Sequence, residues 1–103
     1  MKNILNLLGL ARRAGKVALG YTATTLAIKK GLVPLVLMAT DTAPHTREKM
    51  ERLCRKYCVD LYYLADQGEL GRALGKNAQN VVGVTSKEMA SALKKQILSA
   101  RTE

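Results

Sequence analysis

The chain of 103 residues is long enough for a hydrophobic core, and we expect residues 1–103 to form a single domain. A hydrophobic content of 48% excludes a disordered chain, and no stretch approaches the ~18 apolar residues of a membrane span. The formal net charge is +9, and residues 1–40 contain six Lys or Arg and no acid. We therefore expect an anionic partner, most commonly a nucleic acid, rather than a surface that is merely soluble.

The first half of the chain alternates helical and extended patterns. Apolar residues recur at helical spacing near the N-terminus and predict an amphipathic helix, whereas a later run is continuously apolar, as in a strand buried on both faces. The expected elements are a helix closed by Gly15, an extended segment at 16–19, a helix at about 22–30 and a strand at 34–40.

The second half continues this alternation. The expected elements are a helix after Pro44, a strand at 61–65, a short helix between a capping-box-like Asp66 and Gly75, a strand at 81–85, and a last helix opened by Thr85. The inner stripe of the helix after Pro44 is predicted to be Met50, Leu53, Cys54 and Tyr57. Because helices and strands alternate through short links, we expect an α/β sandwich with helices on both faces of a mostly parallel sheet.

Residue types that carry catalysis or hold metals are sparse. The single histidine, His45, lies at a helix start, and Cys54 and Cys58 supply only two of the four ligands of a closed zinc site. We interpret both cysteines as core thiols on the inner side of the third helix. Asp41 ends the apolar strand, where α/β enzymes often place carboxylates, but a turn or helix start explains it equally well. We expect no enzyme activity, cofactor, metal or small-molecule substrate, and a cytoplasmic protein with reduced thiols.

The start of the second helix is a candidate anion site. Gly20 precedes this helix, so its first-turn N–H groups point outward with partial positive charge. Hydroxyl-bearing residues follow Gly20, and Arg12, Arg13 and Lys16 precede it. Each of these residues also has a simple structural explanation, such as a helix cap at Thr22. The polar loop GKNAQN, at 75–80, adds amides that suit RNA base edges.

Several segments, in this order, resemble a known family. LLGLARRAGKVALG, GYTATTLAIKKG, VLMATDTAP, and ELGRALGK before VVGVT are similar to the small bacterial YlxQ-like members of the ribosomal L7Ae/L30e superfamily of RNA-binding proteins. The resemblance covers nearly the whole chain. It implies a three-layer α/β/α sandwich in which helices cover both faces of a four-stranded mixed sheet. It also implies binding to kink-turns, which are RNA helices bent by tandem sheared G·A pairs, through the start of the second helix and the loop before the last strand.

The chain departs from this family at contact positions. The family pattern at the second helix is Gly-Thr-Asn-Glu-x-x-Lys, and here Thr22, Ala23 and Leu26 occupy the Asn, Glu and Lys positions. The carboxylate that reads guanine and the helix lysine are therefore absent. We expect RNA binding with little preference for an intact kink-turn.

Together, these observations predict a non-catalytic RNA-binding protein of ribosomal type that recognises structured, kink-turn-like RNA. The alternative is a protein-interaction module in which the basic face is incidental. The predicted RNA-binding residues are Arg13, Lys16, Gly20, Tyr21, Thr22, Ala23, Thr24, Thr25, Lys29, Lys30, Lys76, Asn77, Ala78 and Gln79.

Overall fold

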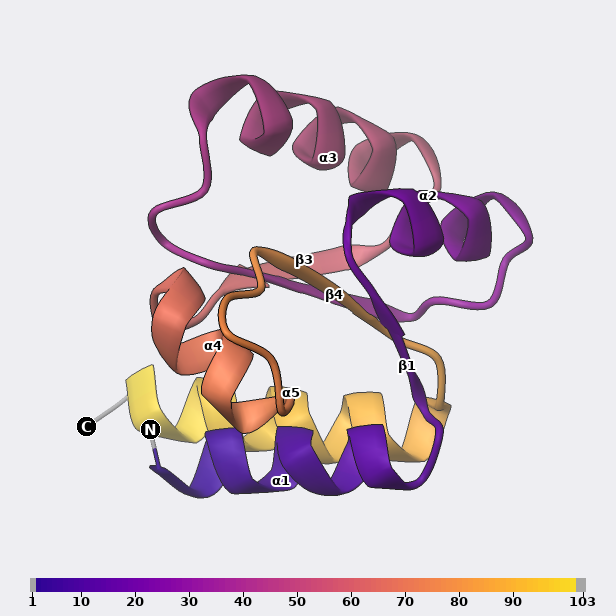
Figure 1. Cartoon of the computed structure of the whole chain (residues 1–103). Coiled ribbons are helices and arrows are strands. Elements are labelled where there is room, and N and C mark those ends of the chain that lie inside the picture. Colours follow the sequence, from indigo (N-terminus) through magenta and orange to yellow (C-terminus); the bar gives the residue numbers. More distant parts are fainter. Residues whose placement is uncertain (1, 102–103) are drawn as a thin grey trace.

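Three layers, with a four-stranded sheet in the middle, make up the computed structural model, which describes residues 2–101 (Figure 1). The strands are β1 (Val17–Leu19), β2 (Leu35–Met38), β3 (Asp60–Tyr63) and β4 (Val81–Val84). The helices of one face are α2 (Tyr21–Lys29) and α3 (Pro44–Lys56), and those of the other are α1 (Lys2–Arg13), α4 (Gln67–Ala73) and α5 (Lys87–Arg101). The α/β/α sandwich is confirmed. None of the helices between residues 2 and 101 is long and apolar enough to cross a membrane.

The sheet is mixed, with the order β1-β4-β2-β3. Strand β4 runs antiparallel to both β1 and β2, and only β2 and β3 are parallel. The mixed sheet implied by the family resemblance is therefore confirmed, whereas the mostly parallel sheet expected from alternation is wrong. The reason lies in the short helix α4. Tyr63, at the end of β3, and Val81, at the start of β4, are both register partners of Met38, so α4 and its loop return the chain to the same end of the sheet.

Strand β2 divides the core in two. Its four residues are all fully buried. Because successive side chains of a strand point to opposite faces, Leu35 and Leu37 pack with α1, α4 and α5, whereas Val36 and Met38 pack with α2 and α3. Full burial of such a side chain contributes about 1.5–3 kcal/mol. The continuously apolar run was thus correctly interpreted as a strand buried on both faces.

Helix α3 buries a narrower stripe than the sequence predicted. Met50 and Cys54 are buried, and burial raises the pKa of the Cys54 thiol to about 11. Tyr57, however, is 39% exposed, and Cys58 is exposed as well. The interpretation of both cysteines as core thiols is therefore wrong for Cys58. The cause is the end of the helix, since Lys56 is its last residue and the chain turns away at Cys58.

This turn at Cys58 is a Schellman motif, in which the next N–H groups bond back to the last helical carbonyls. The Val59 N–H donates to the Cys54 carbonyl at 2.8 Å, and the Cys58 N–H donates to that of Arg55 at 3.4 Å. The motif needs a residue with positive φ, and Cys58 has a φ of 56°. Helices α1, α2 and α4 end in the same way, but with glycine at this position. Cys58 is therefore a non-glycine residue at a position that favours glycine.

We predict that Cys58→Gly stabilises the protein by up to about 1 kcal/mol, because glycine adopts this conformation without a Cβ clash. The measurement is the free energy of unfolding in urea. Cys58→Ala is the matched control: it removes the thiol but keeps the Cβ, so it should bring no such gain. Equal stability of the two variants would show that the backbone at residue 58 is not strained.

Candidate nucleic-acid interface

The start of α2 and the loop before β4 lie side by side, although about 60 residues separate them in the sequence. The Gly20 N–H donates to the Val81 carbonyl at 2.9 Å. The same carbonyl accepts a bond from Gln79 Nε2 at 3.2 Å. A Cβ built on Gly20 would lie 3.6 Å from that amide nitrogen. The structure thus brings together the two segments that the sequence had singled out.

Gly20 leaves the N-terminus of α2 open. It is the N-cap residue, and its φ of 92° and ψ of 169° fall in a region that is essentially restricted to glycine. No side chain caps the helix at this position. Thr22 and Ala23, in the first turn, are exposed. The first-turn N–H groups and the positive end of the helix dipole are therefore available to an anion.

The loop at 76–80 is held in place by α4. A Cβ on Gly71 would lie only 2.7 Å from the Ala78 Cα, so the backbone of the loop packs directly on the helix at this glycine. The Gln79 N–H also donates to the Gln67 carbonyl at 3.0 Å. Lys76, Asn77 and Ala78 are exposed. The loop therefore presents its side chains outward from a fixed backbone. Gly71 is not among the residues predicted from the sequence. It lies in the LGRALG segment, residues 70–75, which carries part of the family resemblance.

Carboxylates fix the start of α4. The Asp66 side chain accepts a bond from the Glu69 N–H at 2.9 Å, and Glu69 reaches back to the Asp66 N–H, which completes the predicted capping box. Asp41, in the turn after β2, accepts a bond from the Gln67 N–H at 2.9 Å. The carboxylate that the sequence left open between a catalytic and a structural role is thus bonded to a helix start.

Two threonines of α2 differ from their predicted role. Thr24 is fully buried; its hydroxyl donates to the Ala18 carbonyl at 3.2 Å, and its side chain lies against Gly83. Its predicted contact with RNA is therefore wrong, because no surface of this side chain is available. Thr25 is half-buried, and it faces α3 together with Tyr21 and Lys29 rather than the loop at 76–80.

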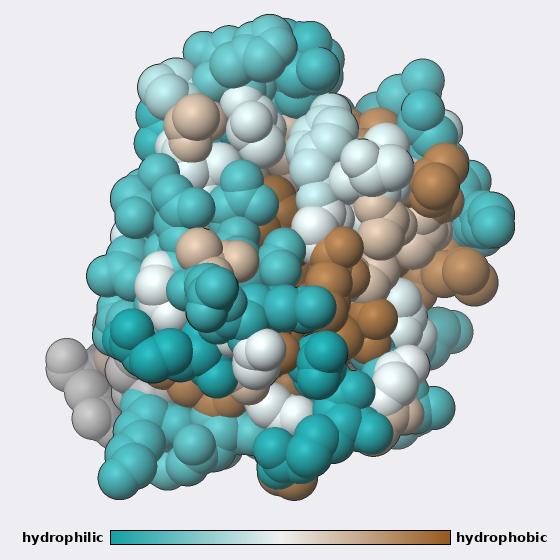
Figure 2. All heavy atoms as spheres, viewed as in Figure 1, coloured by the Kyte–Doolittle hydropathy of each residue, from teal (hydrophilic) through white to brown (hydrophobic). Residues whose placement is uncertain are grey.

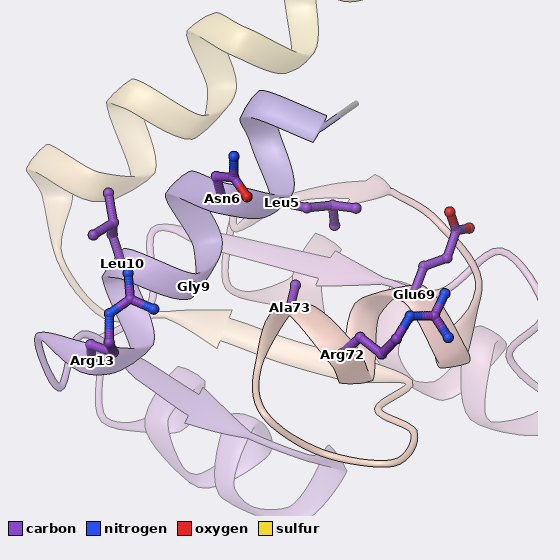
Figure 3. A pocket seen from close by; sticks show the side chains of 8 residues that line it. All are labelled: Leu5, Asn6, Gly9, Leu10, Arg13, Glu69, Arg72 and Ala73. Carbon is purple, nitrogen blue, oxygen red and sulfur yellow. The ribbon is translucent and has the colours of Figure 1, made fainter.

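The predicted cations are not all near this surface. Arg13 lines a pocket of about 480 Å³ between α1 and α4, on the other face of the sheet from α2, and Figure 3 shows Arg13 and Arg72 at its two ends. Lys16 lies at the opposite end of β1 from Gly20, about 13 Å away at ~3.3 Å per residue. Lys30 is the exposed C-cap of α2. The structure therefore separates Arg13, Lys16 and Lys30 from the helix start.

Arg12, rather than Arg13, lies near Gly75, the residue that precedes the loop. A Cβ on Gly75 would lie 3.8 Å from Arg12 Nη1.

Figure 2 shows hydrophilic residues over α3, α4 and most of α1, with brown colour mainly around β1 and the end of α2. His45 is exposed. Across residues 2–101, no three His, Cys, Asp or Glu side chains come close enough to hold a metal ion. The open helix start and the exposed side chains of Lys76 and Asn77 are chemically suited to an anion.

Comparison with known proteins identifies the family. The chain belongs to the Ribosomal protein L7Ae/L30e/S12e/Gadd45 family, which matches residues 2–95. The RNA-binding protein YlxQ of Bacillus subtilis (strain 168) is 37% identical over 87 residues, which are 84% of this chain and 87% of YlxQ. The family that the sequence motifs indicated is confirmed.

Solved structures share the fold. The structure of a protein with unknown function from Bacillus halodurans C has a TM-score of 0.88 at 33% identity, covering 91% of this chain and 95% of that one. The Giardia lamblia 15.5kD RNA binding protein has a TM-score of 0.78 at 18% identity, covering 93% and 82% of the two chains. The sandwich is thus retained at low sequence identity.

We predict that Gly71→Ala lowers the free energy of unfolding by about 1–3 kcal/mol, because the new methyl group forces the loop backbone at Ala78 away from α4. Urea unfolding provides the measurement. Gly68→Ala, in the same helix, is the control. Its Cβ would lie 3.3 Å from Asp66 Oδ1, the oxygen that caps the helix, and 3.7 Å from Arg72 Nη1, so only side-chain atoms have to shift and the loss should be smaller than at Gly71. A Gly71→Ala protein as stable as the control would show that the loop is not packed on the helix.

Proposed function

We propose that this protein binds structured, kink-turn-like RNA, without catalysis, through the surface formed by the start of α2 and the loop at 76–80. The observation that carries the proposal is that an uncapped helix N-terminus and an exposed polar loop adjoin on a chain of net charge +9. Membership of a family that includes the RNA-binding protein YlxQ supports it.

The two segments make different contributions. The first-turn N–H groups of α2 bind phosphate oxygens and thereby orient the RNA, and Lys76 adds a charge on the neighbouring loop. The side-chain amide of Asn77 is exposed and suits the edges of unpaired bases. Gln79 contributes by position, since its amide bonds to the Val81 carbonyl and so links the loop to β4.

The RNA is held through its phosphates more than through its bases. Ala23 and Leu26 are both exposed, and Leu26 is 55% exposed. Neither side chain can accept or donate a hydrogen bond, although the family resemblance places a carboxylate and a lysine here. The backbone groups of α2 remain, and these read the position of phosphates rather than the identity of bases.

We predict that Gly20→Val weakens RNA binding strongly at every salt concentration. A β-branched residue is strained at a φ of 92°, so the helix start that holds the phosphates is distorted. Lys76→Ala should instead reduce the slope of log affinity against log salt by roughly one unit. Binding isotherms at several salt concentrations test both, with circular dichroism as the check on folding. Lys95→Ala, on α5, is the control. An affinity that barely depends on salt concentration would favour the protein-interaction alternative.

We also predict that the protein discriminates weakly between a kink-turn RNA and the same RNA with its G·A pairs replaced. A well-made base contact gives roughly 1–3 kcal/mol of discrimination, and the side chains at 23 and 26 offer no such contact. Gel-shift titrations of the two RNAs provide the measurement. Ala23→Glu combined with Leu26→Lys should restore a preference for the intact kink-turn. A preference of a hundredfold or more in the unmodified protein would contradict the prediction.

A further inference from the structure

An open groove of about 220 Å³ lies between α2 and α3. Its lining residues are Tyr21, Thr25 and Lys29 on α2, and Lys49, Arg52, Leu53 and Lys56 on α3. Four of these seven side chains are cationic, all four are exposed, and none of the seven is acidic. Three of the cations come from α3 and were not among the predicted RNA-binding residues. Their spacing places them on one face of α3, but the sequence alone does not show that α2 lies opposite.

The groove cations lack an anionic partner within the part of the chain that the structure describes. The ion pair found there joins Lys94 to Asp60 at 2.5 Å, and it does not involve the groove. Glu51, a near neighbour on α3, is bonded to the Tyr63 hydroxyl on the β3 side of the helix. Like charges three or four residues apart on a helix repel, so Lys49 and Lys56 both repel Arg52. Glu48, four residues before Arg52, offsets part of this repulsion, and a bound anion would offset the rest.

One aromatic ring lies among these cations. Lys49 Nζ is 5.7 Å from the centre of the Tyr21 ring, which lines the groove. Tyr57 follows Lys56 in the chain and is 5.7 Å from its Nζ, but it is not part of the lining. A groove that combines cations for the backbone with an aromatic face for the bases is characteristic of single-stranded nucleic-acid binding. A protein partner with an acidic surface would use the charges but has less need of the ring.

The groove is also continuous with the proposed RNA site. Tyr21 directly follows Gly20, so the groove opens beside the helix start that holds the phosphates. Its residues on α2 are spaced i, i+4 and i+8, which extends it about 12 Å along the helix axis. An RNA bound at the start of α2 can therefore continue into the groove.

We propose that the groove between α2 and α3 binds a single-stranded segment that flanks the structured RNA, with its phosphates on Lys29, Lys49, Arg52 and Lys56. This inference rests on the proposed function, because it assigns a second contact to the same RNA. The structured part of the RNA engages the start of α2 and the loop at 76–80, and the flank engages the groove.

The test is a cycle of two RNAs and three proteins. One RNA is a kink-turn hairpin whose stem ends blunt. The other is the same hairpin with single-stranded uridine flanks of roughly ten nucleotides at its 5′ and 3′ ends, a length within the range that single-strand sites cover. The groove variant combines Lys49→Ala, Arg52→Ala and Lys56→Ala. The matched control combines Lys2→Ala, Lys87→Ala and Lys95→Ala, which removes the same charge from exposed positions on α1 and α5. Alanine favours helix at all six positions, and circular dichroism verifies folding.

The unmodified protein and the control variant should bind the flanked RNA about tenfold more tightly than the blunt RNA, whereas the groove variant should bind both equally. For the flanked RNA, the groove variant should also show a salt slope smaller by about two units, since each single-strand phosphate contact contributes ~0.7. If the unmodified protein binds neither RNA, the proposed function itself fails. If it binds both RNAs equally, or if the groove variant keeps the flank preference and slope of the control, the inference is overturned.

Discussion

The position of β4 between β1 and β2 is the constraint on which the interface depends. Because β4 runs antiparallel to both neighbours, its first residue lies beside the last residues of β1. The chain leaves β1 at Gly20 and enters β4 at Val81, and the hydrogen bond between these two residues fastens the start of α2 to the end of the loop at 76–80. A parallel β4 would enter at the other end of the sheet and would place the loop a full strand away. The order and direction of the strands therefore bring the two segments of the interface together, and this placement depends on the backbone alone.

Small residues then set how closely the supporting segments approach. Gly71 lets the loop backbone pack directly on α4, and Gly83 makes room for the buried side chain of Thr24 on the opposite face of the sheet. Thr24 in turn bonds to Ala18 in β1, so α2 is tied to the strand that precedes it. The result is an exposed surface on a rigid support. The residues proposed to contact RNA, at the start of α2 and in the loop, are mostly exposed. The residues behind them, such as Gly71 and Thr24, are buried and make the packing contacts.

The sequence predicts the helices and strands well, because each depends on the spacing of apolar residues and glycines within a short segment. Helical periodicity, glycines at helix ends and the apolar run of β2 correctly placed the helices and the central strand. Strand direction is not local. It depends on where α4 and its loop return the chain, and only the family resemblance supplied it. The candidate site was predicted in part for the same reason. Gly20 and Gln79 meet as expected, but neighbours in sequence such as Arg13 and Lys16 diverge once α1 and β1 separate. The cations of α3 were missed because their partner helix is identified only by tertiary packing.

The net charge of +9 also has more than one cause. Arg12 and Arg13 in α1, Lys29 in α2 and Arg55 and Lys56 in α3 all lie in the last turn of a helix. There the helix dipole favours a cation by about 0.3–1 kcal/mol. The occurrence of these basic residues is therefore explained without a bound ligand. Lys49 and Arg52 differ, because both lie inside α3 and gain nothing from its end. They share the groove with two further cations and have no acidic neighbour in its lining. Glu48, four residues before Arg52, can offset part of the charge of that residue, whereas Lys49 has no acid three or four residues away on α3. Of the four groove cations, Lys49 is therefore the one whose charge the chain balances least, and its position favours an anion from outside the chain.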